Sequence, residues 1–488
     1  MKIGKTDLFK MKKLLAKFKN LSLPARASLA YTLANLVSKG VSVITVPIFT
    51  RMLTTSEVGV GTTYSSWYSI LYTVITLALT SGSVNIAMME YDKNRDEYES
   101  ACLTLSSISG VIFLLIVLLF SSYLSAITTL SKPILLLMAI SIIVNPALDF
   151  WYARQRFEYK YISSVIVSIS VTVLSAVLAV MAILMYRYSS VNLGEVKVIA
   201  QGIVLIAAGC IAYIYIFVKG RTFVNLQIWK NALIWSLPLI VHTVSKSILD
   251  VSDRIMIVRM CGQSEAGIYG TIYSLAMLSL IVWNAINTSL IPTTFEHLKK
   301  GEYQKENTLI KSVLLIFGVV AILVTLFAPE ILLMFTTKEY MQAVYLVPAL
   351  SSGIYFTAVY NIYGNFLLYK KKTTYIMIST VIAAFSNLVM NYIYIRIYGY
   401  MAAAYTTLAS FIILALIQSW LCYKEFKAHV INEKAVFVLS SVVVVLCLLC
   451  NLIYRFYIIR YLIIIAILII ACLNRRNIIK YFIHGKKD

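Results

Sequence analysis

Residues 51–63, RMLTTSEVGVGTT, and residues 259–271, RMCGQSEAGIYGT, are two copies of one short pattern at a constant offset of 208 residues. The copies share an initial Arg-Met pair, a central Ser-Glu pair, a glycine two residues after the glutamate and a final threonine. Each copy lies between two long apolar runs. The pattern predicts a chain of two homologous halves, each beginning with two helices joined by this turn. The alternative is chance similarity between two short membrane turns.

The regions around both copies are apolar enough to lie in a bilayer. Of the 488 residues, 60% are hydrophobic and 13% are charged, whereas a soluble domain has roughly 25% charged residues. Apolar windows of about 19 residues or more predict fourteen membrane-spanning helices and an all-α, polytopic membrane protein. The predicted spans are residues 28–50, 62–86, 101–123, 133–153, 162–186, 196–218, 231–257, 266–292, 310–328, 341–368, 373–395, 400–423, 435–453 and 457–473.

The basic residues predict the orientation of these spans. The net charge is +22, and of the 43 Lys and Arg residues, 31 fall on the side that holds both termini, 10 on the other side and two inside spans. This bias is the positive-inside signature, so both termini are expected in the cytoplasm. Topology and anionic lipid account for the basic excess, and no nucleic-acid partner is expected.

The repeat divides the chain into five regions. Residues 1–26 form a cytoplasmic basic arm, either a helix in the membrane interface or a frayed tail. Residues 27–223 form an N-lobe of six spans, and residues 224–430 form a C-lobe of six spans. Two further spans occupy residues 431–474, and a basic cytoplasmic tail occupies residues 475–488. Because six spans separate the copies, the lobes are pseudo-symmetric about an axis along the membrane normal, with a substrate path between them.

Charged side chains inside spans are the main candidates for function, because each costs about 2.5 to 3.5 kcal/mol at the bilayer centre. Lys39 lies in the middle of the first span. The seventh span carries a charged stripe about 120° wide on a helical projection. Its members are His242, Lys246, Asp250, Asp253 and Arg254.

Two interpretations of these charges remain open. In the first, Lys39 and Lys246 line a hydrated cavity and bind an anionic group. In the second, Lys246 pairs with Asp250 and Asp250 with Arg254 at i,i+4 spacing, which neutralises the stripe without a ligand. Lys39 has no acidic residue within one turn. Arg51 and Arg259 lie near the outer mouth, where they contact either substrate or lipid phosphate.

Several of these residues carry a resemblance to a known family. The lysine of the first span, the turn from Arg51 to Gly59, Asp253-Arg254 followed by Gly262, Glu265 to Tyr269, and Ile291-Pro292 are its motifs. They resemble the polysaccharide repeat-unit flippases of the multidrug/oligosaccharidyl-lipid/polysaccharide exporter superfamily, and the span pattern is similar over nearly the whole chain.

The resemblance implies a transporter rather than an enzyme. It implies two six-helix lobes that alternate between inward and outward openings in the bacterial cytoplasmic (inner) membrane. The implied cargo is a polyprenyl-diphosphate-linked oligosaccharide, moved to the outer leaflet for O-antigen, capsule or exopolysaccharide assembly. Candidate cargo-binding residues are Lys39, Lys246, His242, Arg254, Arg51 and Arg259. Membrane lipid, a polysaccharide polymerase and chain-length machinery are the other expected partners.

No cofactor, metal ligand set or catalytic residue is predicted. Asp250 and Asp253 are candidates for proton or sodium coupling. Two alternatives from the same superfamily are a flippase for the peptidoglycan lipid precursor and a multidrug/cation antiporter. The antiporters typically have an acidic residue in the N-lobe cavity, whereas the first span here has a lysine and no acid. A membrane polymerase or glycosyltransferase would need a large outer loop or paired surface carboxylates, and neither is visible.

Overall fold

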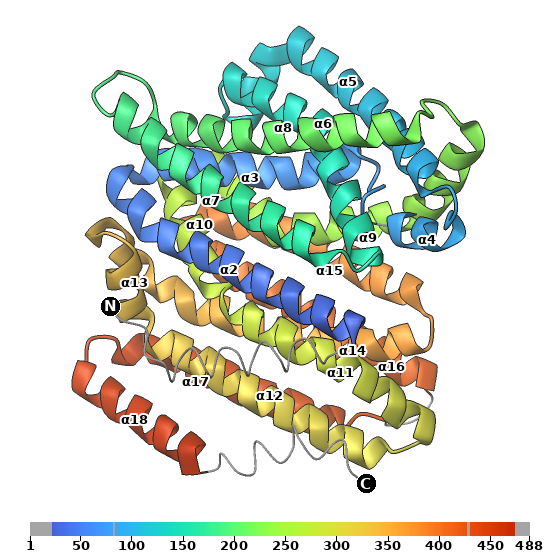
Figure 1. The fold of residues 1–488 in the computed structure, drawn as a ribbon. Helices are drawn as coiled ribbons and strands as arrows, with labels where there is room; N and C mark the ends of the chain where they lie inside the picture. Colours follow the sequence, from blue (N-terminus) through green and yellow to red (C-terminus); the bar gives the residue numbers. More distant parts are fainter. Residues whose placement is uncertain (1–21, 82, 427–429, 474–488) are drawn as a thin grey trace, which may run out of the picture. The chain divides into compact units, whose positions relative to one another are not determined.

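The computed structural model describes residues 22–81, 83–426 and 430–473. Residues 1–21 of the predicted basic arm and the predicted basic tail lie outside these ranges. The described residues form helices and no strands, so the prediction of an all-α membrane protein is confirmed (Figure 1). By length and hydropathy, nine of the described helices can cross a membrane, or eleven if each of two bent pairs counts as one span.

The first of two compact units comprises the described part of residues 1–45 together with residues 71–240. Its helices include α4 (Ser83–Glu90), α5 (Arg95–Thr128), α6 (Lys132–Phe157), α7 (Tyr161–Tyr186) and α8 (Leu193–Gly220). Helix α6 packs against α5 and α8, and α7 packs along α8. Tyr98 and Phe150 are fully buried in the core between them.

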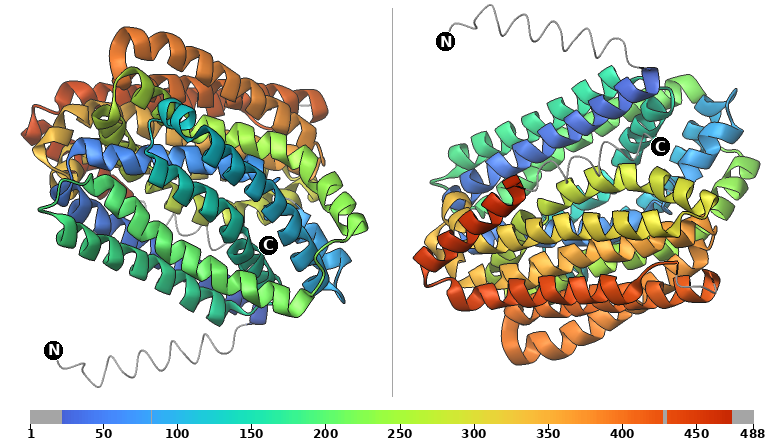
Figure 2. Two further views of the ribbon diagram at one scale, coloured as in Figure 1. Left: turned by 90° about the horizontal axis from the view of Figure 1, so that it is seen from above. Right: turned by 90° about the horizontal axis from the view of Figure 1, so that it is seen from below.

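The second unit comprises residues 46–70 and the described residues from 241 onward. At its core is α14 (Val347–Tyr369), which packs against α12 (Tyr303–Leu326), α16 (Ala402–Phe426) and α17 (Glu433–Ile453). Tyr355 and Tyr363 of α14 are fully buried. Helix α18 (Tyr457–Leu473) also contacts α12 (Figure 2). The remaining helices are α10 (Gln263–Ala276), α11 (Ser279–Lys300), α13 (Ala328–Phe335), η1 (Lys338–Leu346), α15 (Thr373–Tyr398) and η2 (Gly399–Met401).

Three helices take part in both units. Helix α2 (Leu23–Met52) passes from the first unit to the second after Thr45, and α3 (Thr55–Ile75) passes back after Ile70. Helix α9 (Leu226–Met260) enters the second unit after Ile240. It bends by 48° between Leu226–Leu237 and Leu239–Met260. The sequence has a proline between these segments, and proline has no N–H for a helical hydrogen bond. The boundaries between the two units therefore fall within the first helix of each predicted lobe and within α3.

All fourteen predicted spans coincide with helices, but three of them are broken or bent, among them span 231–257 at the bend of α9. The predicted span 62–86 consists of α3 and α4, separated by a turn in which Leu77 and Ala78 have positive φ angles of 55° and 47°. The predicted span 266–292 bends by 40° between α10 and α11. Helix α13, between the ninth and tenth spans, was not predicted, and the predicted tenth span begins within η1 rather than at the start of α14. Hydropathy does not detect the two interruptions because the segments on both sides of each break are apolar, and α13 and η1 are too short to register as spans.

The two repeat copies contact each other directly within the second unit. A Cβ added to Gly59 would lie 1.9 Å from the Gln263 carbonyl oxygen, and one added to Gly267 would lie 2.1 Å from that of Thr55. Thr55 and Gln263 occupy equivalent positions in the repeat, so the two contacts are reciprocal. A hydrogen bond of 2.8 Å joins the Thr55 and Ser264 hydroxyls across the same crossing. The glycines shared by the copies thus permit close approach of α3 and α10.

We expect Gly267→Ala to destabilise the protein by about 1 to 3 kcal/mol, because backbone must move to accept the methyl group. Thermal unfolding of the detergent-solubilised protein measures the effect. Gly40→Ala is the matched control, because nothing lies within 4 Å of a Cβ there. It should be neutral or slightly stabilising. Equal melting temperatures for the two variants would contradict the tight crossing.

Candidate functional site

The charged stripe of α9 contains one ion pair. The Lys246 ammonium donates to both carboxylate oxygens of Asp250, at 2.6 and 2.5 Å. The Lys246 and Asp250 side chains are 37% and 30% exposed, respectively. The predicted i,i+4 pairing of these two residues is therefore present, and the pair is accessible rather than sealed in the core. Whether either residue binds cargo stays a prediction.

Arg254 does not complete the predicted chain of pairs with Asp250. Its guanidinium carbon lies 4.1 Å from the centroid of the Tyr273 ring on α10, a cation–π arrangement. The buried Nε of Arg254 has no hydrogen-bond partner among the described residues. The aromatic ring of a neighbouring helix, which the sequence of α9 alone does not reveal, thus determines where this cation lies.

Asp253 is almost completely buried, at 1% exposure. The Tyr269 hydroxyl donates to its Oδ2 at 2.5 Å, and the Arg254 backbone N–H donates to its Oδ1 at 2.8 Å. Both carboxylate oxygens are therefore engaged, and the bond to Tyr269 joins α9 to α10. The predicted role of Asp253 in ion coupling stays a prediction.

His242 lies one turn before Lys246 and is half-buried. Its Nδ1 finds no hydrogen-bond partner among the described residues. Asp250 and Arg254 follow Lys246 at steps of four residues, so the half-exposed end of the stripe consists of an imidazole, an ammonium and a carboxylate. This set can bind an anion through Lys246 only if Asp250 moves away.

Lys39 is in a different situation from Lys246. It is exposed on α2 and forms no ion pair with any described residue. Lys39 belongs to the first unit and Lys246 to the second. Their predicted meeting around one ligand stays a prediction.

The two arginines of the repeat turns are both exposed. The Arg51 guanidinium donates to the Met334 carbonyl at 3.0 Å and to the Pro47 carbonyl at 3.2 Å. The first bond ties the end of α2 to the end of α13, which gives Arg51 a structural contact. Arg259 ends α9 at the equivalent position. Cargo contact by either arginine stays a prediction.

A buried amide network in the second unit was not foreseen. The Ser252 hydroxyl of α9 donates to Asn387 Oδ1 at 3.1 Å, and Asn391 Nδ2 donates to the same oxygen at 2.9 Å. The Thr406 hydroxyl of α16 donates to Asn391 Oδ1. The available signal was the pair of asparagines four residues apart within the apolar span 373–395. Buried amides need partners, and here they join α9, α15 and α16.

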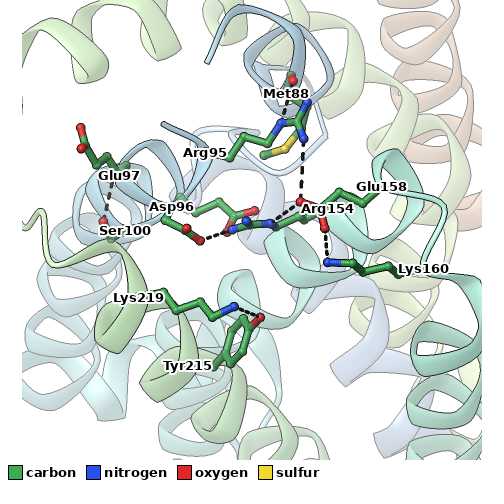
Figure 3. A network of polar contacts seen from close by, with 11 residues as sticks. Met88, Arg95, Asp96, Glu97, Ser100, Arg154, Glu158, Lys160, Tyr215 and Lys219 are labelled. Atoms are coloured by element: carbon green, nitrogen blue, oxygen red, sulfur yellow. Dashed lines mark hydrogen bonds and ion pairs between the residues drawn. The ribbon is translucent and has the colours of Figure 1, made fainter. Parts of the chain in front are cut away.

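The first unit has an unforeseen charge cluster around Arg154, near the end of α6 (Figure 3). Its guanidinium pairs with Asp96, with Glu99 at 3.1 Å and with Glu158 at 2.9 Å. Lys160 also pairs with Glu158, at 2.6 Å. Burial alone would raise the pKa of Glu158, but its bonds to Lys160 and Arg154 outweigh burial and bring that pKa below its usual value. The cluster fastens α5 to α6.

We expect Arg154→Gln to lower the free energy of unfolding by about 3 kcal/mol, because Glu99, at 1% exposure, loses its cation. Arg187→Gln is the control, since Arg187 follows the end of α7 and is exposed. Its effect should stay within about 0.5 kcal/mol. The melting temperatures of the two solubilised variants measure the difference, and an Arg154 variant as stable as the Arg187 control would refute the assignment.

The chain was compared with known proteins through family models. The model described as polysaccharide biosynthesis protein matches residues 25–298, more than half of the chain. The chain belongs to this family. A second model, MatE, matches residues 238–393. The predicted membership of the multidrug/oligosaccharidyl-lipid/polysaccharide exporter superfamily is thereby confirmed.

Two similar proteins come from Haemophilus influenzae. An uncharacterized membrane protein is 26% identical over 262 residues, which cover 52% of this chain and 64% of the relative. The alignment thus spans less than two thirds of that relative's length. A protein of the Lsg locus is 23% identical over 386 residues, which cover 76% of this chain and 92% of the relative.

Solved structures show the same fold at low sequence identity. The lipid II flippase MurJ, in an inward closed conformation, aligns with a TM-score of 0.72 and 14% identity, covering 93% of this chain and 99% of that one. An inward-facing multidrug resistance MATE family transporter aligns with a TM-score of 0.59 and 13% identity, covering 81% of this chain and 94% of that one. The predicted two-lobe membrane architecture is confirmed by these structures.

Proposed function

We propose that this protein moves polyprenyl-diphosphate-linked oligosaccharide repeat units from the cytoplasmic to the outer leaflet of a bacterial cytoplasmic membrane. The transport mechanism is alternating access, and the product serves surface polysaccharide assembly. The observation that carries the proposal is Lys39, an exposed cation on the first helix with no ion-pair partner among the described residues.

The chemistry of the first helix favours an anionic cargo. Residues 23–52 contain no Asp or Glu, so an ammonium near the middle of this span has no carboxylate of its own helix to neutralise it. Such a charge is costly in the bilayer unless water or a ligand compensates it. The diphosphate of a lipid-linked sugar offers that compensation. A cation-exporting relative would instead need an acid at this depth.

A second candidate cargo is the peptidoglycan lipid precursor. The alignment with a lipid II flippase over 93% of this chain favours it. This precursor is also a polyprenyl diphosphate carrying sugars, so Lys39 would serve either cargo. The family match to polysaccharide biosynthesis proteins favours the repeat unit.

The proposed setting follows from the same function. Both termini lie in the cytoplasm, membrane lipid surrounds the helices, and a polymerase with its chain-length machinery consumes the flipped repeat units. The energy source is assigned to a proton or sodium gradient, with Asp250 and Asp253 as the candidate coupling residues.

Lys39→Ala should leave the protein inserted but make lipid-linked repeat units accumulate on the cytoplasmic leaflet, with surface polysaccharide reduced about tenfold or more. Labelling of lipid-linked glycans by a membrane-impermeant reagent, together with surface polysaccharide assays, measures both effects. Lys39→Arg should retain most activity because it keeps the charge. Lys132→Ala, which removes an exposed lysine at the start of α6, is the matched control.

Normal surface polysaccharide in the Lys39→Ala strain would refute the role of Lys39. Depleting the protein separates the two cargoes. Accumulation of polyprenyl-linked repeat units supports the proposal, whereas accumulation of the peptidoglycan precursor with intact surface polysaccharide supports the second candidate.

A further inference from the structure

We infer that Asp250 pairs with Lys246 while no cargo is bound. When a cargo phosphate binds Lys246, Asp250 moves and pairs with Arg254 instead. The inference rests on the proposed function, because it requires a phosphate-bearing cargo. It assigns Asp250 a role as an internal competitor for the cargo's anionic group. The three residues follow one another at i, i+4 and i+8 on α9, so Asp250 lies between two cations on one helix face.

The first step is that the existing pair can open. Lys246 and Asp250 are 37% and 30% exposed, so the described residues do not enclose either partner. A partly exposed ion pair can exchange partners when another anion competes for its ammonium group. A diphosphate carries more negative charge than one carboxylate. It can therefore displace Asp250 from the Lys246 ammonium.

The second step is that Asp250 has another partner available. Arg254 lies one turn further along, and its buried Nε has no hydrogen-bond partner among the described residues. A buried donor without a partner costs about 1 to 3 kcal/mol. Asp253 does not supply this bond in the structure: its oxygens accept hydrogen bonds from the Tyr269 hydroxyl and the Arg254 backbone N–H, and neither oxygen bonds the Arg254 Nε. Rotation of Asp250 toward Arg254 would satisfy the orphaned donor.

The third step concerns reversibility. Binding of a phosphate to Lys246 without this movement would leave Asp250 unpaired beside apolar helices, which is strongly unfavourable. With the movement, Lys246 and Asp250 each have a partner of opposite charge in both states, and Arg254 gains a carboxylate partner in the second state. Return of Asp250 to Lys246 then expels the phosphate. The exchange keeps affinity moderate, which a transporter needs in order to release its cargo.

The test uses the full-length protein in nanodiscs and in proteoliposomes, with a fluorescent polyprenyl diphosphate as probe. Asp250→Asn should bind the probe about tenfold more tightly, through slower dissociation, and should transport it more slowly. In the Lys246→Gln background, Asp250→Asn should give no such gain. Arg254→Gln should weaken binding several-fold, because Asp250 loses its second partner.

Glu296→Gln is the matched control. It breaks an exposed i,i+4 pair with Lys300, in which the ammonium lies 2.6 Å from the carboxylate, outside the stripe. This variant should bind the probe as the wild type does. Asp250→Ala provides a second removal of the carboxylate, and thermal unfolding identifies any variant that fails to fold.

The outcomes separate the two proposals. Tight binding by the wild type with unchanged or weaker binding by Asp250→Asn and Asp250→Ala overturns the exchange and leaves the proposed function intact. A gain that persists in the Lys246→Gln background also overturns it. Absence of probe binding by the wild type and every variant overturns the proposed function, and the exchange with it.

Discussion

The close crossing of α3 and α10 is the constraint on which the arrangement of the second unit depends. Gly59 and Gly267 each face a backbone carbonyl of the other repeat copy, so neither position can carry a side chain without movement of main chain. The crossing brings the turn after α2 against the turn after α9. It thereby holds residues 46–70 in the second unit, although they are close in sequence to the first. The glycines shared by the two copies are thus explained by packing.

Most of the buried charged side chains have a partner, which is either an opposite charge or a hydrogen-bond donor. Arg154 compensates three carboxylates in the first unit, and Tyr269 together with a backbone N–H satisfies Asp253 in the second. Lys39 and Arg254 depart from this pattern in different ways. Lys39 has no ion-pair partner among the described residues. The Arg254 guanidinium lies over the Tyr273 ring, but its Nε has no hydrogen-bond acceptor among these residues. Such departures in a membrane protein are expected where a substrate passes.

Sequence reasoning located the helices and the repeat because apolar runs and glycine spacing are local signals. It also found the i,i+4 pair of Lys246 and Asp250. The sequence did not show whether Asp250 pairs with Lys246 or with Arg254, because both lie four residues away. The Tyr273 ring that contacts Arg254 belongs to another helix. The Arg154 cluster and the Asn387 network depend likewise on helices distant in sequence. The break after α3 is set by backbone angles at Leu77 and Ala78, two residues that are ordinary in helices.

The sharing of α2, α3 and α9 between units limits how this chain can be recombined. A chimaera with a relative joined at residue 223, between the predicted lobes, would take residues 46–70 from one parent and their packing partners after residue 241 from the other. The turn of one parent, around Thr55, would then have to pack against Gly267 of the other parent. We therefore expect exchange between relatives to be tolerated best when one segment carries both copies of the turn together.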